Sequence, residues 1–126
     1  MKQKEKFSFS GRINSFKYAG NGAKHLLYEH NFRIHIGAAI LAILMGILLS
    51  ISVLEWCIVF LCIGLVLCAE GLNTAIEVVC DRIIPEYDEA IKKAKDISAA
   101  SVSFVAVVAL IIGILIFLPK LLSLPT

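Results

Sequence analysis

Three long runs of apolar residues set the strongest limit on what this chain can fold into. Residues 36–54 contain no charged side chain, residues 56–80 contain two, and residues 97–118 contain none. A helix of about 20 apolar residues crosses the roughly 30 Å hydrocarbon core of a bilayer. The chain is 59% hydrophobic and 17% charged, whereas soluble domains have about 45–50% apolar and about 25% charged residues. We therefore predict an all-α membrane protein, a single domain over residues 1–126 with three transmembrane helices.

The basic residues are distributed unevenly, and they predict how the chain is oriented. Seven of the twelve lie in residues 1–35, and four lie in residues 82–95, between the second and third apolar runs. Loops on the cytoplasmic side of a membrane carry the excess of Lys and Arg. We therefore expect the N-terminus in the cytoplasm and the C-terminus outside. The N-terminal segment has no apolar stretch of the kind that a secretory signal needs, so none is expected.

Residues 9–30 have the periodicity of an amphipathic helix. Apolar residues recur there at three- and four-residue steps, with basic residues between them. This pattern predicts a helix that lies in the headgroup layer of the membrane. A bend or break is expected at residues 20–22, because the sequence Gly-Asn-Gly favours a turn. The helix either anchors the chain to the membrane surface or covers a site there, and both interpretations remain open.

The second apolar run carries a stripe of polar side chains. The members of this stripe are Glu70, Asn73, Thr74, Glu77 and Asp81. Their three- and four-residue spacing predicts that all of them lie on one face of a helix. A carboxylate at membrane depth costs a few kcal/mol, so an acidic residue within a span indicates a function. At about 1.5 Å per residue, Glu70 lies about 10 Å deeper than Glu77.

A second polar face marks the start of the third helix, where Asp88, Lys92, Lys95 and Asp96 are followed by small residues such as Ala99. Two acids at different depths beside a Lys-Asp pair suit either cation passage or phosphoryl transfer to a lipid alcohol. Phosphoryl transfer needs oxygen ligands for Mg²⁺, a positive group and a carboxylate base. A polar seam that only holds helices together is a third possibility. Walker A and protein-kinase motifs are missing from the sequence, so an ATP site is expected to have another design.

The polar stripe resembles the signature of a known family. Residues 70–81 (EGLNTAIEVVCD) are similar to the E-x-[hydrophobic]-N-[ST]-A-I-E-x-x-x-D motif of the small prokaryotic diacylglycerol kinases. Residues 94–100 (AKDISAA) resemble a second element of that family. Residues 29–35 (EHNFRIH) are most like its Gram-positive undecaprenol kinase branch. The resemblance covers about residues 10–119 and implies three-span lipid kinases of the bacterial cytoplasmic (inner) membrane. It also implies homotrimers whose active sites are shared between neighbouring chains.

The resemblance also implies roles for individual residues. Glu70 corresponds to the general base that binds the lipid hydroxyl and takes its proton, Asn73 lies beside the reaction centre, and Lys95 neutralises the transferring phosphate. Glu29 and Glu77 correspond to ligands of the Mg²⁺ that holds the ATP phosphates. Asp96 either holds Lys95 or contacts the nucleotide. The remaining implied contacts are Tyr18, Glu86 and Tyr87 with the nucleotide and Ala99 with the lipid.

We therefore expect an enzyme that uses ATP to phosphorylate undecaprenol, with Mg²⁺ as cofactor. Diacylglycerol is the alternative lipid within the same chemistry. A small ion-conducting or transport subunit is the alternative from another functional class, and it would move charge without ATP. The expected partners are ATP, a lipid alcohol, the bilayer and further copies of the chain, and no nucleic acid.

Overall fold

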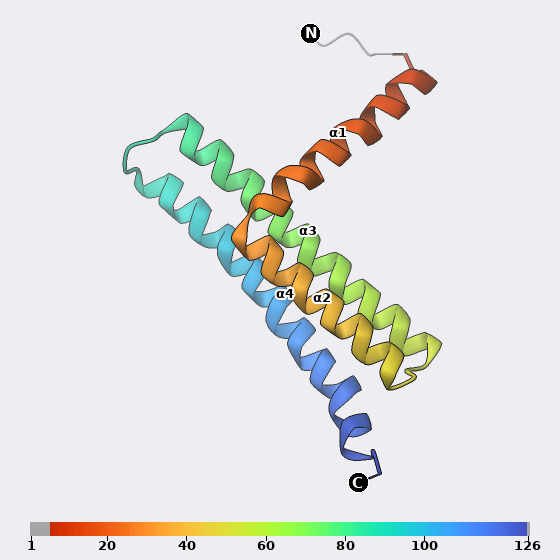
Figure 1. The fold of residues 1–126 in the computed structure, drawn as a ribbon. Helices are drawn as coiled ribbons and strands as arrows, with labels where there is room; N and C mark the ends of the chain where they lie inside the picture. Colours follow the sequence, from red (N-terminus) through yellow and green to blue (C-terminus); the bar gives the residue numbers. More distant parts are fainter. Residues whose placement is uncertain (1–5, 126) are drawn as a thin grey trace.

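The computed structural model describes residues 6–125, and every regular element within them is a helix. Two of the N-terminal basic residues on which the predicted orientation depends, Lys2 and Lys4, lie outside the described residues. The helices in chain order are α1 (Phe9–Tyr28), α2 (His30–Leu48), α3 (Val53–Ile83) and α4 (Glu89–Leu122). The last three are long and apolar enough to cross a membrane, and they lie along one another as a bundle from which α1 projects (Figure 1). The predicted all-α fold with three membrane spans is therefore confirmed.

Helix α1 is continuous, so the predicted break at residues 20–22 is wrong. Ser8 caps the start of the helix, because its side chain accepts a hydrogen bond from the Gly11 backbone N–H at 3.1 Å. No packing forces a bend at Gly20 or Gly22, since a Cβ placed on either would meet nothing within 4 Å. The chain turns instead at Glu29, whose extended backbone (φ −77°, ψ 129°) separates α1 from α2. Glycine weakens a helix by about 1 kcal/mol, which the rest of this 20-residue helix tolerates.

The first membrane helix ends at Leu48, six residues before the predicted boundary at residue 54. Ser52 begins α3 through a capping box, in which its side chain accepts from the Glu55 N–H and the Glu55 carboxylate accepts from the Ser52 N–H. This reciprocal pair satisfies two helix-end donors. Glu55 therefore belongs to the first turn of α3, and residues 49–52 form the connection between the two helices.

Helix α4 is longer at both ends than the apolar run that predicts it. It begins at Glu89, and its N-cap is Asp88, whose side chain accepts a hydrogen bond from the Ile91 N–H at 3.0 Å. It also continues through Pro119 to Leu122, although the apolar run stops at residue 118. The two turns before the run carry the basic and acidic residues of the second polar face. Helices α3 and α4 thus extend together beyond the junction of α1 and α2 (Figure 1).

Candidate active site

Glu70, in the middle of α3, is the one charged residue that is buried in the described part of the chain. Only 3% of it is exposed, and Nε2 of His35 on α2 lies 3.6 Å from its Oε2. This distance lies within ion-pair range but exceeds that of a hydrogen bond. A carboxylate at membrane depth is costly without a partner, so these side chains form one unit, the His35–Glu70 pair. The sequence motif includes His35 but gives it no role, because the pair exists only once α2 packs on α3.

Asn73 and Glu77 lie on the same face of α3 as Glu70, as their spacing predicts. Nδ2 of Asn73 donates a hydrogen bond to Oε1 of Glu77 at 3.3 Å. Asn73 is buried, and its Oδ1 has no hydrogen-bond partner among the residues that the structure describes. A buried acceptor left unpaired costs about 1–3 kcal/mol. The Asn73 Oδ1 atom is therefore available to a ligand that brings a hydrogen-bond donor or a cation.

The Glu77 carboxylate suits a hard cation such as Mg²⁺. Between residues 6 and 125, no group of three or more His, Cys, Asp or Glu side chains is placed to hold a metal ion. Mg²⁺ usually takes one or two carboxylates and completes its shell with substrate phosphates and water. A carboxylate at the position of Glu77 therefore fits this ion. Glu29, the other predicted ligand, lies at the bend between α1 and α2 with an exposed side chain.

The lysines at the start of α4 form ion pairs that differ from the expected ones. Lys95 Nζ donates to Asp81 Oδ1 at 2.7 Å, which ties α4 to the end of α3. Lys92 Nζ lies 2.6 Å from Asp96 Oδ2, one turn along the same helix. The expectation that Asp96 holds Lys95 is therefore wrong. Consecutive residues on a helix point in different directions, whereas residues four apart face each other, so Asp96 meets Lys92 and Lys95 faces α3.

The other predicted site residues lie apart from this cluster. In residues 6–125, none of their side chains forms a hydrogen bond or an ion pair with the polar stripe of α3. Tyr18 is exposed on α1, Glu86 and Tyr87 are exposed in the connection between α3 and α4, and Ala99 is exposed on α4. The structure therefore places Glu70, Asn73 and Glu77 on one face of α3 and ties Lys95 to Asp81 at the end of that face. His35, beside Glu70, is an addition that sequence reasoning missed.

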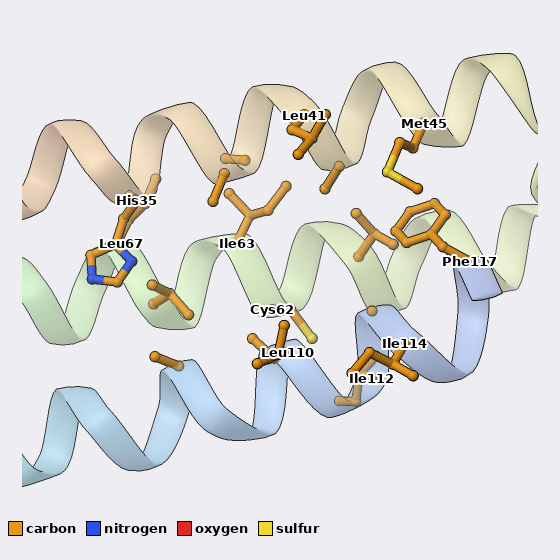
Figure 2. Close-up of a pocket in the computed structure, with 18 of the residues that line it drawn as sticks. His35, Leu41, Met45, Cys62, Ile63, Leu67, Leu110, Ile112, Ile114 and Phe117 are labelled. Carbon is orange, nitrogen blue, oxygen red and sulfur yellow. The ribbon is translucent and has the colours of Figure 1, made fainter.

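An apolar groove of about 600 Å³ runs between α2, α3 and α4. His35 lies at one end of this groove and Phe117 at the other (Figure 2). Apart from His35, its lining consists of hydrocarbon and sulfur-containing side chains and one glycine. The volume falls in the range of about 300–1,000 Å³ that is usual for small-molecule sites. The groove therefore suits a long hydrocarbon chain whose polar end lies at the His35–Glu70 pair.

The geometry combines a buried carboxylate, beside the histidine that lines one end of an apolar groove, with a polar stripe that becomes more exposed along α3. Glu70 and Asn73 are buried, Glu77 is half-buried, and Asp81 is exposed. A carboxylate in this position can accept a proton from an alcohol whose hydrocarbon part fills the groove. Oxygen ligands and a lysine at the more exposed end can meet a phosphate group. The arrangement thus suits chemistry between a polar phosphate donor and a lipid alcohol.

Comparison with known proteins agrees with this chemistry. Residues 17–117 match the prokaryotic diacylglycerol kinase family. Undecaprenol kinase from Bacillus subtilis (strain 168) is 44% identical over 110 residues, which cover 86% of this chain and 89% of that protein. Diacylglycerol kinase from Escherichia coli (strain K12) is 33% identical over 104 residues, covering 82% and 85%. Diacylglycerol kinase from Synechocystis sp. is 38% identical over 112 residues, covering 87% of this chain and 64% of that protein. The chain therefore belongs to the prokaryotic diacylglycerol kinase family and is a membrane lipid kinase.

Proposed function

We propose that this kinase transfers the γ-phosphoryl group of ATP to the hydroxyl of undecaprenol. The observation that carries the proposal is the position of Glu70, which is 3% exposed and lies 3.6 Å from His35, the residue that lines one end of the apolar groove. Diacylglycerol is the alternative substrate within the same chemistry. The high identity to an undecaprenol kinase supports the first choice, and the diacylglycerol kinases among the relatives keep the second one open.

Glu70 acts as the general base in this proposal. The alcohol oxygen attacks the γ-phosphorus, its O–H bond breaks, and the proton passes to the Glu70 carboxylate. The new O–P bond forms while the bond between the γ-phosphorus and the β–γ bridging oxygen breaks, so that ADP leaves with that oxygen. Asn73 lies one turn from Glu70 and orients the reacting groups through its unpaired Oδ1. Lys95 leaves Asp81 to neutralise the transferring phosphate.

Glu77 and Glu29 would hold Mg²⁺ at the more exposed end of the site. When bound, Mg²⁺ would supply the positive charge that neutralises the nucleotide phosphates. The Glu77 carboxylate is kept in place by the Asn73 amide at 3.3 Å. The residues proposed to contact the rest of the nucleotide are Tyr18, Glu86, Tyr87 and Asp96. Ala99, a small residue on α4, is proposed to contact the lipid.

The lining of the groove favours a polyprenol over a diacylglycerol. Beyond its hydroxyl a polyprenol is entirely hydrocarbon, whereas a diacylglycerol carries two ester carbonyls within a few atoms of its hydroxyl. If the hydroxyl meets Glu70, these carbonyls enter a groove in which, among the described residues, no lining side chain other than His35 offers an N–H or O–H donor. Each unpaired acceptor costs about 1–3 kcal/mol. Two of them cost at least about 2 kcal/mol, which corresponds to about 30-fold in kcat/KM.

We also propose that the protein lies in the bacterial cytoplasmic (inner) membrane with its N-terminus in the cytoplasm. The unequal distribution of basic residues supports this orientation. Helix α1 suits the membrane surface, because apolar side chains such as Phe9, Ile13 and Phe16 are exposed along it. The three spans bury few of their side chains within one chain, which supports association of copies. The expected assembly is a homotrimer with active sites shared between chains.

The proposal is tested by phosphate transfer in mixed micelles that contain undecaprenol and γ-labelled ATP. The wild-type protein should label the lipid, and Glu70→Gln should abolish labelling while nucleotide binding persists. Glutamine keeps the size of the side chain but cannot accept the proton. Transfer to no lipid alcohol would refute the kinase proposal, and substantial activity in Glu70→Gln would refute the assignment of the base.

A further inference from the structure

We propose that His35 is a positioning residue for the catalytic base, Glu70. His35 holds one carboxylate oxygen of Glu70 and leaves the other oxygen free for the substrate hydroxyl. The inference rests on the proposed lipid-kinase function of this site. It concerns a side chain on α2, whereas the predicted reacting groups lie on α3 and α4. Its basis is the 3.6 Å approach of His35 Nε2 to Glu70 Oε2 at the head of the apolar groove.

The Glu70 carboxylate needs an external partner to be held in one orientation. A glutamate side chain has several rotatable bonds, and fixing a long, flexible side chain costs up to about 2 kcal/mol. Among residues 6–125, no Lys, Arg or other His side chain lies within ion-pair distance of Glu70. Asn73, the next polar residue of the stripe, directs its amide N–H toward Glu77. His35 is therefore the side chain placed to orient the base.

The two members of the His35–Glu70 pair differ in how far they are buried. The Glu70 side chain is 4% exposed, while that of His35 is 21% exposed and borders the groove. A ring in this position can approach the carboxylate from one side while the substrate chain lies along the other. Hydrogen bonds of catalytic groups are often long in the unloaded enzyme and shorten when the substrate binds. Closing the pair by about half an ångström would bring it into hydrogen-bond range.

The role of His35 depends on one nitrogen atom, and this gives a sharp test. In a glutamine at this position, the amide nitrogen lies about where Nε2 lies in histidine, so it still reaches Glu70. In an asparagine the amide is one methylene shorter and falls short of the carboxylate. The two substitutions have the same polar group, so a role in packing or polarity alone would affect both similarly. The variants His35→Gln and His35→Asn thus form a matched pair, with His35→Ala as the full deletion.

We would measure kcat and KM for ATP and for the lipid alcohol with each purified full-length variant in mixed micelles. A misplaced catalytic group costs about 10- to 100-fold in rate. We expect His35→Ala and His35→Asn to lose this much in kcat, with the KM for ATP unchanged. His35→Gln should keep kcat to within about threefold, because it restores the contact with the base. His25→Ala is the control, since His25 is an exposed histidine on α1.

The inference is wrong if His35→Gln is as slow as His35→Asn, or if all three variants keep the wild-type kcat. It is also wrong if the only change is a higher KM for the lipid, which would make His35 a lipid contact. Size-exclusion elution shows whether each variant keeps its assembly, and the Gln and Asn pair decides the matter even if the alanine variant does not fold. The kinetics are run with whichever lipid alcohol the wild type phosphorylates. If undecaprenol is not the substrate, the wild-type protein shows this before any variant is measured. That result is therefore distinct from a failure of the inference about His35.

Discussion

Gly113 on α4 gives a direct way to test whether the apolar groove holds the substrate chain. It lines the groove, and a Cβ placed on it would meet no other atom within 4 Å. A leucine at this position therefore begins from a Cβ that meets no other protein atom and adds its side chain to the lining of the groove. Gly64 on α3 is the matched control, because a Cβ there also meets nothing within 4 Å and it is not among the described residues that line the groove.

The expected effect of Gly113→Leu follows from the contacts that the lipid would lose. The four carbon atoms of the leucine side chain occupy space that the lipid chain would otherwise fill. The displaced lipid atoms lose on the order of ten carbon–carbon contacts, each worth about 0.1–0.2 kcal/mol. The loss is about 1–2 kcal/mol, or about 5- to 30-fold in kcat/KM for the lipid. The KM for ATP should stay unchanged, since the nucleotide binds at the more exposed end of the site.

The assay is initial-rate transfer of labelled phosphate at varied lipid mole fraction, with size-exclusion chromatography of both variants to compare their assembly. Gly64→Leu should change kcat/KM for the lipid by less than about twofold, because a surface change away from the site seldom exceeds about 0.5 kcal/mol. Equal losses in the two leucine variants would refute the groove as the site of the chain. So would a Gly113→Leu enzyme with wild-type lipid kinetics.

Two further predictions concern the nucleotide and the packing of α2. Glu77→Ala should weaken binding of the Mg²⁺–nucleotide complex, while binding of the free nucleotide changes little. Calorimetry with and without Mg²⁺ measures both affinities. Equal weakening in the two conditions would show that Glu77 is not a ligand of the metal. Gly46→Ala should lower the free energy of unfolding by about 1–3 kcal/mol, because its Cβ would lie 2.7 Å from the Trp56 ring. Gly37→Ala on the same helix meets nothing within 4 Å and should stabilise by up to about 1 kcal/mol. Unfolding followed by circular dichroism compares the two, and equal shifts would refute the packing argument.

The helices and the polar stripe are features that the sequence predicts well, because both depend on local periodicity. Apolar runs of this length have few alternatives to membrane helices. Spacing of three and four residues places Glu70, Asn73 and Glu77 on one face wherever the helix packs. The graded burial along that face agrees with the predicted difference in depth.

Contacts between helices are the part that sequence reasoning could not supply. The His35–Glu70 pair joins α2 to α3, and the Lys95–Asp81 pair joins α3 to α4. Each depends on how the helices are rotated and aligned, which local spacing does not determine. The spacing of Lys92 and Asp96 did contain the signal for their own pairing, since residues four apart on a helix face each other.

The predicted end of the first membrane helix is wrong because the apolar composition of residues 49–54 hides the capping signal that starts the next helix. The sequence Ser52-Val-Leu-Glu55 has the Ser-x-x-Glu pattern of a capping box, yet the apolar residues around it extended the predicted first span to residue 54. At residues 20–22 the sequence Gly-Asn-Gly predicts a turn that does not form, because the helix continues through it from both sides. Proline at residue 119 is likewise contained within α4.

The substrate of this kinase is tested most directly by a comparison of undecaprenol and diacylglycerol at equal mole fraction in the same micelles. Undecaprenol should be phosphorylated with a kcat/KM at least about 30-fold higher, because the two ester carbonyls of diacylglycerol remain unpaired in the groove. Equal rates, or a preference for diacylglycerol, would contradict it.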